Sequence, residues 1–171
     1  MRLRPLNADS AEEITLIANR MRDTLIEVEG EARGAAMYTQ EWLENRLRWH
    51  LDAEQVCAQV IVACDADGMI CGHTIYRIEQ QAEERFGLIS TTYVLPAYRQ
   101  SGIASRLLQS AHDWFLSHGI YSSNTWTSAT NTKLIALYQK HGYHIAEEGP
   151  NDLTGTLMVR LTVQLSASGN C

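Results

Sequence analysis

One segment of the sequence combines a basic residue, two small residues and a change from strand to helix pattern. It reads Tyr-Val-Leu-Pro-Ala-Tyr-Arg-Gln-Ser-Gly-Ile-Ala over residues 93–104. The first N–H groups of a helix lack intrahelical partners, and the helix dipole places about half a positive charge there. Gly102 and Ala104 are small enough for an anion to approach the backbone, and Arg99 adds positive charge at the rim. The segment favours a phosphate site, although many capped helices that follow a strand bind nothing.

A second segment, residues 131–143, follows after one more helix and one more strand. It reads Asn-Thr-Lys-Leu-Ile-Ala-Leu-Tyr-Gln-Lys-His-Gly-Tyr. Asn131 and Tyr138 are seven residues apart, so they lie on one face of a helix, two turns apart. A phenol with a pKa of about 10 is protonated at neutral pH and can donate a proton to a leaving group. Considered without the first segment, Tyr138 fits a buried position of an amphipathic helix better.

The elements that must position these segments follow from the periodicity of apolar residues. A capping box at Ser10 opens a first helix, residues 30–36 form a Gly-rich stretch, and Thr39 caps a second helix. Two clearer helices span 102–118 and 131–141, and each ends at a glycine. Strands are predicted over 3–6, 56–63, 69–78, 86–95, 121–127, 143–146 and 156–165. This order predicts an α/β fold with a mixed sheet flanked by helices.

Length and composition indicate one soluble domain. The 171 residues are 45% hydrophobic and 20% charged, and we expect a domain over 1–165 with a polar tail over 166–171. No apolar run approaches the roughly 20 residues of a membrane span. Residues 1–7 are not followed by the apolar stretch typical of a signal sequence, so we expect a cytoplasmic protein. A net charge of −6 disfavours nucleic acid as a partner.

The cysteines give no pattern typical of a metal site. The sequence contains four cysteines, and no pair has the Cys-x2-Cys spacing of zinc sites, so we expect no metal. A two-residue hairpin loop at Asp67-Gly68 would place Cys64 opposite Cys71. In a cytosolic protein these two would be reduced thiols.

The two segments together resemble the GNAT superfamily of acetyl-CoA-dependent N-acetyltransferases. Arg99-x-x-Gly102-x-Ala104 resembles the pyrophosphate loop of that family, Arg/Gln-x-x-Gly-x-Gly/Ala. Residues 131–143 resemble its second motif, Asn-x-x-Ala-x-x-Leu-Tyr-x-Lys-x-Gly-Phe/Tyr, with Leu134 where alanine is usual. The resemblance covers almost the whole chain. It implies a single-domain GNAT-like fold whose mixed, mostly antiparallel sheet is splayed.

The resemblance also implies roles for individual residues, with acetyl-CoA as co-substrate. Pantetheine would pair with the backbone of Thr92, Tyr93 and Val94 and with Asn131. The pyrophosphate would lie on the N–H groups of Gln100, Ser101, Gly102, Ile103, Ala104 and Ser105, with Arg99 beside them. Tyr138 would act as the general acid toward the thiolate.

The group that deprotonates the amine is left open by the sequence. Members of the family often carry a glutamate on the strand that leads into Val-x-Pro, and residues 88–93 contain no carboxylate here. Glu84 only precedes that stretch, so the alternatives are His73, Glu79 or a base that acts through water.

The acceptor is expected to be a small cationic amine. Glu27, Glu29 and Glu31 lie between the first two helices, a region that covers the acceptor pocket in this family, and Trp42, Trp49 and Trp126 could form its walls. Alternatives are a protein or peptide N-terminal acetyltransferase and a non-catalytic acyl-CoA sensor of the same fold. A homodimer is compatible with either.

Overall fold

A computed structural model of the chain describes residues 1–152 and 154–166. The strands are β1 (Arg2–Pro5), β2 (Ala58–Cys64), β3 (Ile70–Gln81), β4 (Glu84–Val94), β5 (Ser122–Ser128), β6 (His144–Pro150) and β7 (Leu157–Gln164). The helices are α1 (Ala11–Glu29), α2 (Glu31–Met37), α3 (Gln40–Leu51), α4 (Ile103–Ser117) and α5 (Thr132–Lys140), and a 3-10 turn, η1, spans Pro96–Tyr98. Of the tail predicted over 166–171, all but Ser166 lies outside the described residues.

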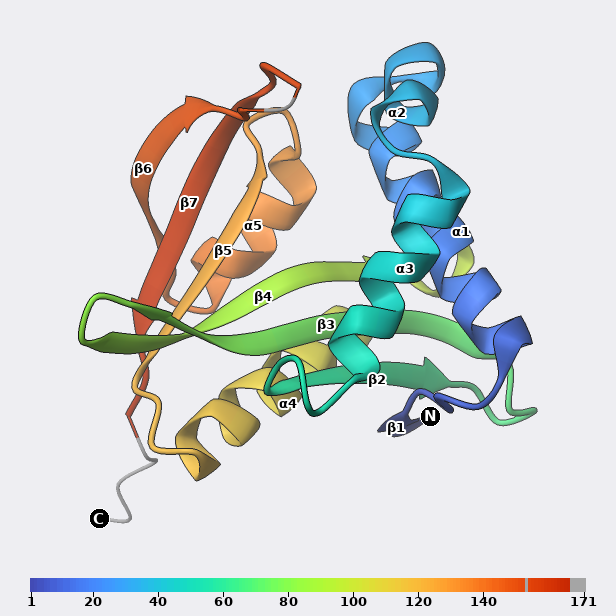
Figure 1. Cartoon of the computed structure of the whole chain (residues 1–171), viewed down its shortest axis with the longest axis horizontal. Coiled ribbons are helices and arrows are strands. Elements are labelled where there is room, and N and C mark those ends of the chain that lie inside the picture. The colour runs from blue at the N-terminus through green and yellow to red at the C-terminus, as the bar shows by residue number, and fades with distance from the viewer. Residues whose placement is uncertain (153, 167–171) are drawn as a thin grey trace.

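The strands form one open sheet in the order β1-β2-β3-β4-β5-β7-β6 (Figure 1). Every neighbouring pair is antiparallel except β4 and β5, which run parallel. The fold predicted from the sequence, a single α/β domain with a mixed and mostly antiparallel sheet, is therefore confirmed. Within the described residues, no helix is long and apolar enough to cross a membrane.

The sheet is splayed at its centre, as predicted. β4 pairs with β5 only over Gly87–Ile89, although β4 continues to Val94. A bulge lies at the same point, because Ile89 faces Tyr76 on β3 whereas Thr91 already faces Ile75, which leaves Ser90 as the extra residue. Beyond the bulge the two strands separate, and Figure 1 shows the gap opening toward α5.

Helices cover both faces of the sheet. α1 and α3 pack on one face, where Ile17 and Leu47 are fully buried against β2 and β3. α4 packs on the opposite face through Leu107, Leu108 and Phe115. These clusters pack β4 and the start of α4 into the core, which positions the loop between them.

The structure corrects the prediction for residues 30–36. The Gly-rich stretch forms helix α2, which lies against α1, rather than a connecting loop. A Cβ atom on Gly34 would come within 2.5 Å of the backbone of Leu25, so glycine is needed there for close helix packing. The predicted caps at Ser10 and Thr39 are confirmed, since both side chains accept a hydrogen bond from the N–H three residues on.

The expected two-residue hairpin loop at Asp67-Gly68, which would place Cys64 opposite Cys71, is wrong. The hairpin loop contains three residues, because the Asp65 N–H donates to the Met69 carbonyl, and Gly68 takes a left-handed conformation with φ of +85°. Cys64 therefore faces Ile70 in the ladder. Cys64 and Cys71 are both buried free thiols.

Candidate active site

A cavity of about 630 Å³ lies where β4 leaves β5. Ten of the twelve predicted site residues line it: Thr92, Tyr93, Val94, Arg99, Gln100, Gly102, Ile103, Ala104, Ser105 and Asn131. Ser101 and Tyr138 are the two predicted residues outside its lining. Segments almost 40 residues apart in sequence thus meet at one groove, which we call the cofactor groove.

The start of α4 presents unpaired backbone donors to this groove. Gly102 is the N-cap of α4 with φ of +84°, and no side chain caps the helix. The first backbone bond of the helix runs from the Arg106 N–H to the Gly102 carbonyl, and in the described chain no hydrogen bond uses the N–H groups of residues 100–105. A Cβ atom on Gly102 would meet no atom within 4 Å, so the space above it is open. This geometry suits a pyrophosphate.

The positive charge of Arg99 is paired with a carboxylate of the protein itself. Its Nη2 donates to Oε2 of Glu27 at 2.7 Å, its Nη1 donates to the other oxygen, and its Nε donates to the Val94 carbonyl at 2.8 Å. The hydrogen bond from Arg99 lowers the pKa of Glu27, so the carboxylate stays charged. Arg99 therefore ties α1 to the end of β4, while Lys133 and Lys140 add positive charge to the groove.

The edge of β4 that faces the groove lacks a strand partner. Thr92, Tyr93 and Val94 pair with β3 on one edge, opposite residues 72–74. Pairing with β5 on the other edge ends at Ile89 in the part of the chain that the structure describes. Free backbone groups there are available to an extended ligand with amide groups, as pantetheine is.

A second cavity, of about 320 Å³, adjoins the cofactor groove. Thr24, Val28, Thr92, Asn131 and Leu134 line both spaces, so the two meet at the splay of the sheet. We call this second space the acceptor cavity.

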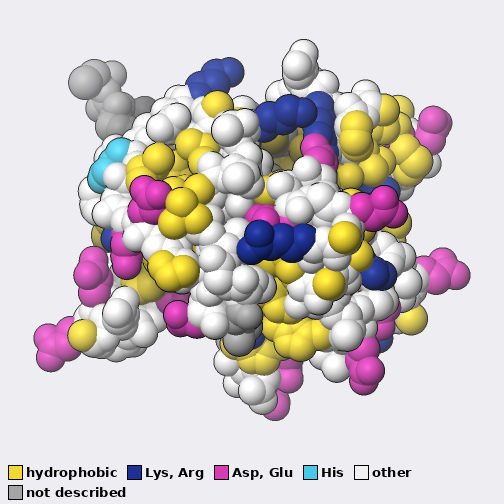
Figure 2. Space-filling view, turned by 90° about the horizontal axis from the view of Figure 1, so that it is seen from above, with side chains coloured by type: hydrophobic (Ala, Val, Ile, Leu, Met, Phe, Trp, Pro, Cys, Tyr) yellow, Lys and Arg dark blue, Asp and Glu magenta, His cyan; other side chains and the backbone are white. Residues whose placement is uncertain are grey.

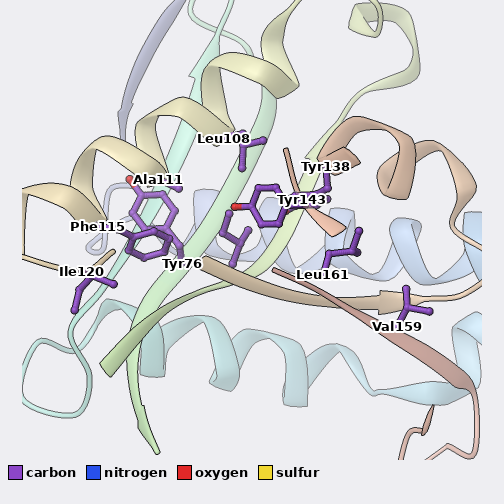
Figure 3. Close-up of a cluster of buried hydrophobic side chains, with 10 residues drawn as sticks. Tyr76, Leu108, Ala111, Phe115, Ile120, Tyr138, Tyr143, Val159 and Leu161 are labelled. Atoms are coloured by element: carbon purple, nitrogen blue, oxygen red, sulfur yellow. The ribbon is translucent and has the colours of Figure 1, made fainter. Parts of the chain in front are cut away.

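Tyr138 lies at the boundary of the acceptor cavity with the core. Its side chain is 1% exposed, and its ring packs edge-on against Tyr143 with centroids 4.8 Å apart (Figure 3). Burial raises the pKa of Tyr138, while hydrogen bonds with Thr92 and Thr125 lower it in part. The phenol is thus protonated at neutral pH and lies beside Thr92, which both cavities share.

Asn131 has a structural task in addition to its place in the groove. Its Oδ1 accepts from the Leu134 N–H, which caps α5, and its Nδ2 donates to Oγ1 of Thr127. The cap fixes the start of α5 and therefore the direction in which Tyr138 points.

The structure does not bring the proposed bases to either cavity. Glu84, His73 and Glu79 are absent from both linings. His73 is fully buried, which lowers its pKa to about 3, and Glu79 forms an ion pair with Arg77. Among the described residues Glu29 is the carboxylate that lines the acceptor cavity.

The three glutamates expected at the acceptor mouth are separated in the structure. Glu27 lies in the cofactor groove, paired with Arg99. Glu29 lines the acceptor cavity, with Arg33 at 3.7 Å, and Glu31 lines neither space. Hydrophobic, acidic and basic side chains are mixed on the face in Figure 2, so no broad patch of one charge covers it.

The aromatic and basic walls of the acceptor cavity were only partly predicted. Trp42 and Trp126 line it as expected, whereas Trp49 does not. Arg46 and Arg77 also line it, and no sequence pattern distinguishes them from the other Lys and Arg residues, 14 in total.

Comparisons with known proteins agree on one family. The chain matches the Acetyltransferase (GNAT) family over residues 16–143. No curated protein matches it significantly. The fold resembles a chain of the NatC complex bound to Gag peptide and CoA, with a TM-score of 0.75, 17% identity and coverage of 96% of this chain and 98% of that one.

Two further structures show the same fold. Ard1 from Thermoplasma volcanium gives a TM-score of 0.74 at 16% identity, with 97% and 98% of the two chains covered. YncA from Salmonella typhimurium, a putative acetyltransferase solved with acetyl-CoA, gives 0.71 at 16% identity, with 100% and 97% covered. Because the family match spans most of the chain and includes both motifs, the chain belongs to the GNAT acetyltransferases and is an acyltransferase that uses acetyl-CoA.

Proposed function

We propose that this protein transfers an acetyl group from acetyl-CoA to the primary amine of a small molecule by direct attack in a ternary complex. The observation that carries the proposal is the junction of two cavities at Thr92, Asn131 and Leu134, with the Tyr138 side chain beside it. One space has the backbone donors for a pyrophosphate, and the other is smaller and partly aromatic. Two substrates could therefore meet next to a proton donor.

The chemistry follows from what lines each space. The pyrophosphate would accept from the N–H groups at the start of α4, and pantetheine would run along the free edge of β4 toward Thr92. The amine nitrogen would attack the acetyl carbonyl from the acceptor cavity, the carbon–sulfur bond would break, and Tyr138 would give its proton to the leaving sulfur. The proton of the amine would leave through water or to Glu29.

The size and charge of the acceptor cavity support a small acceptor. About 320 Å³ is at the lower end of the range for ligand cavities, which is roughly 300–1,000 Å³. Glu29 would attract the ammonium form of an amine. We therefore still expect the acceptor to carry a cationic amino group. A peptide N-terminus is the second candidate, because one of the similar structures, the NatC complex, is bound to a Gag peptide.

The test is release of free thiol from acetyl-CoA across a panel of amines. The panel contains polyamines, aminoglycosides, amino acids and peptides with a free N-terminus, each at the same concentration. Faster release with at least one small amine than with any peptide supports the proposal. Thiol release that no amine accelerates would favour a non-catalytic acyl-CoA sensor, and a peptide as the best acceptor would favour the second candidate.

A further inference from the structure

Two guanidinium groups face the acceptor cavity from one wall, and their surroundings differ. Arg77 is held on both sides, because its Nη1 hydrogen-bonds to Nε2 of His50 and its Nε pairs with Glu79. His50 is fixed in turn by the Arg46 carbonyl, which its Nδ1 contacts at 2.9 Å. Arg77 is therefore a rigid part of the wall with its charge balanced by Glu79.

Arg46 makes no direct ion pair of this kind in the described chain. Its guanidinium lies over the ring of Trp49, 4.2 Å from the centroid, and in the described chain no carboxylate forms an ion pair or hydrogen bond with it. Partial burial and repulsion from Arg77 lower its pKa, and the more distant Glu79 offsets this only in part. A half-buried cation in a cavity wall, next to a second cation, gains most from an anion in that cavity.

Apart from Glu29, the remaining walls are apolar or neutral. Tyr38 and Trp42 stack with centroids 4.3 Å apart, and Met21, Leu25, Met37 and Met158 extend this surface across the cavity. Trp126 contributes a third aromatic ring and is 39% exposed, although it is large and apolar. These side chains suit an apolar body of modest size rather than a polyamine.

We propose that the acceptor is an amino acid with an apolar or aromatic side chain, whose carboxylate binds Arg46 while its α-amine lies beside Thr92 and Tyr138. This inference rests on the proposed function. It adds that the substrate carries a negative group as well as an amine. A cavity of about 320 Å³ lets a molecule of this size contact the arginine wall and the thioester end together.

The experiment measures binding by calorimetry to the protein saturated with CoA, so that it does not depend on turnover. The ligands are L-phenylalanine, L-phenylalaninamide and phenethylamine, which share the ring and the amine and differ in the carboxylate. We expect L-phenylalanine to bind at least about tenfold more tightly than the other two, since a charge-assisted hydrogen bond is lost in both. The amide also mimics a peptide N-terminus.

Two variants locate the effect. Arg46→Met should reduce the affinity for L-phenylalanine to that for phenethylamine, and Arg46→Lys should restore part of it. Arg48→Met is the matched control, because Arg48 is on the same helix, outside the cavity, and half exposed. A normal thermal melt for each variant shows that it is folded.

Four results would overturn the inference, and three of them are comparisons. These are equal affinity for the three ligands, tighter binding of the amide, and an unchanged preference in Arg46→Met. No detectable binding of L-phenylalanine would count equally against it. Failure of every amine to accelerate thiol release rejects the proposed function instead, and the binding comparison still decides whether Arg46 holds a carboxylate.

Discussion

Tyr138 differs from phenylalanine by one oxygen atom, so its substitution tests proton donation with little change in packing. Tyr138→Phe should lower kcat by about 10²–10⁴-fold, the usual range for loss of a general acid, and leave the affinity for CoA nearly unchanged. The protein should lose only about 1 kcal/mol of stability. The loss is small because the two partners of the Tyr138 hydroxyl keep other hydrogen bonds. Thr92 bonds with Thr74, and Thr125 bonds with the Ile89 carbonyl. Steady-state kinetics with acetyl-CoA checks the prediction.

Tyr143→Phe is the matched control for that variant. Tyr143 packs against Tyr138 but bonds to His112 and Ser123, away from both cavities. Its loss of a hydroxyl should affect stability and not kcat. If Tyr138→Phe turned over at the wild-type rate, Tyr138 would be a buried core residue and the acid would lie elsewhere.

At this scale the sequence predicted residues that belong to local motifs and missed the pairs that only the fold creates. Ten of the twelve predicted residues line one groove because two short segments carry most of them. The bond between Arg99 and Glu27 joins residues 72 positions apart, and no spacing rule connects them. Arg46 likewise becomes a candidate binding residue only because the fold places it in one cavity with sheet residues such as Arg77 and Thr92.

The loop between β4 and α4 acts as one unit, and its conformation makes a prediction. Gly102→Val should weaken CoA binding at least tenfold, because the φ of +84° strains any side chain and the valine would occupy the open space above the helix start. Calorimetric titration with CoA measures the effect. Gly119→Val is the control, since Gly119 has φ of +69° at the other end of α4 and lines neither cavity.

The control separates strain from blockage. Both glycines have a positive φ, and a Cβ atom on either would meet no neighbouring atom. Both variants should therefore lose a similar stability, about 1–2 kcal/mol, from backbone strain alone. A CoA affinity that falls equally in the two variants would mean that general destabilisation, rather than the anion loop, explains the loss. An unchanged affinity in Gly102→Val would move the pyrophosphate away from α4.

Element boundaries were predictable where a cap or a turn residue marks them, and α2 shows the limit. Glycines at 30 and 34 look like a loop because glycine is unfavourable inside helices. Gly34 is instead the contact point of α2 with α1, and packing outweighs helix propensity there. The missed helix matters, because Met37 and Tyr38 at its end line the acceptor cavity. The predicted register of the β2–β3 hairpin was wrong for another reason. Its loop contains one residue more than expected, and one extra residue shifts every pair in the ladder.

Across the whole molecule, three buried histidines predict how stability depends on pH. Burial lowers the pKa of His50 to about 4, of His73 to about 3 and of His112 to about 4, against about 6.5 in an unfolded chain. Below pH 6.5 the unfolded chain therefore binds more protons than the folded one. Stability is greatest above pH 6.5 and falls as the pH decreases toward 4, by up to about 3 kcal/mol per histidine.

His73 gives that pH dependence a specific test, because both its ring nitrogens are buried without a hydrogen-bond partner. His73→Leu removes two unpaired polar atoms and keeps a similar volume beside Tyr93, so it should leave the protein as stable or more stable at pH 7. It should also reduce the loss of stability between pH 6.5 and 5.0, a range in which Glu13 stays charged because the hydrogen bond from Arg4 lowers its pKa. Urea unfolding at pH 7.0, 6.0 and 5.0 measures both effects. A variant that is less stable than wild type by more than about 1 kcal/mol at pH 7 would indicate that the imidazole is hydrogen-bonded, for example to a buried water.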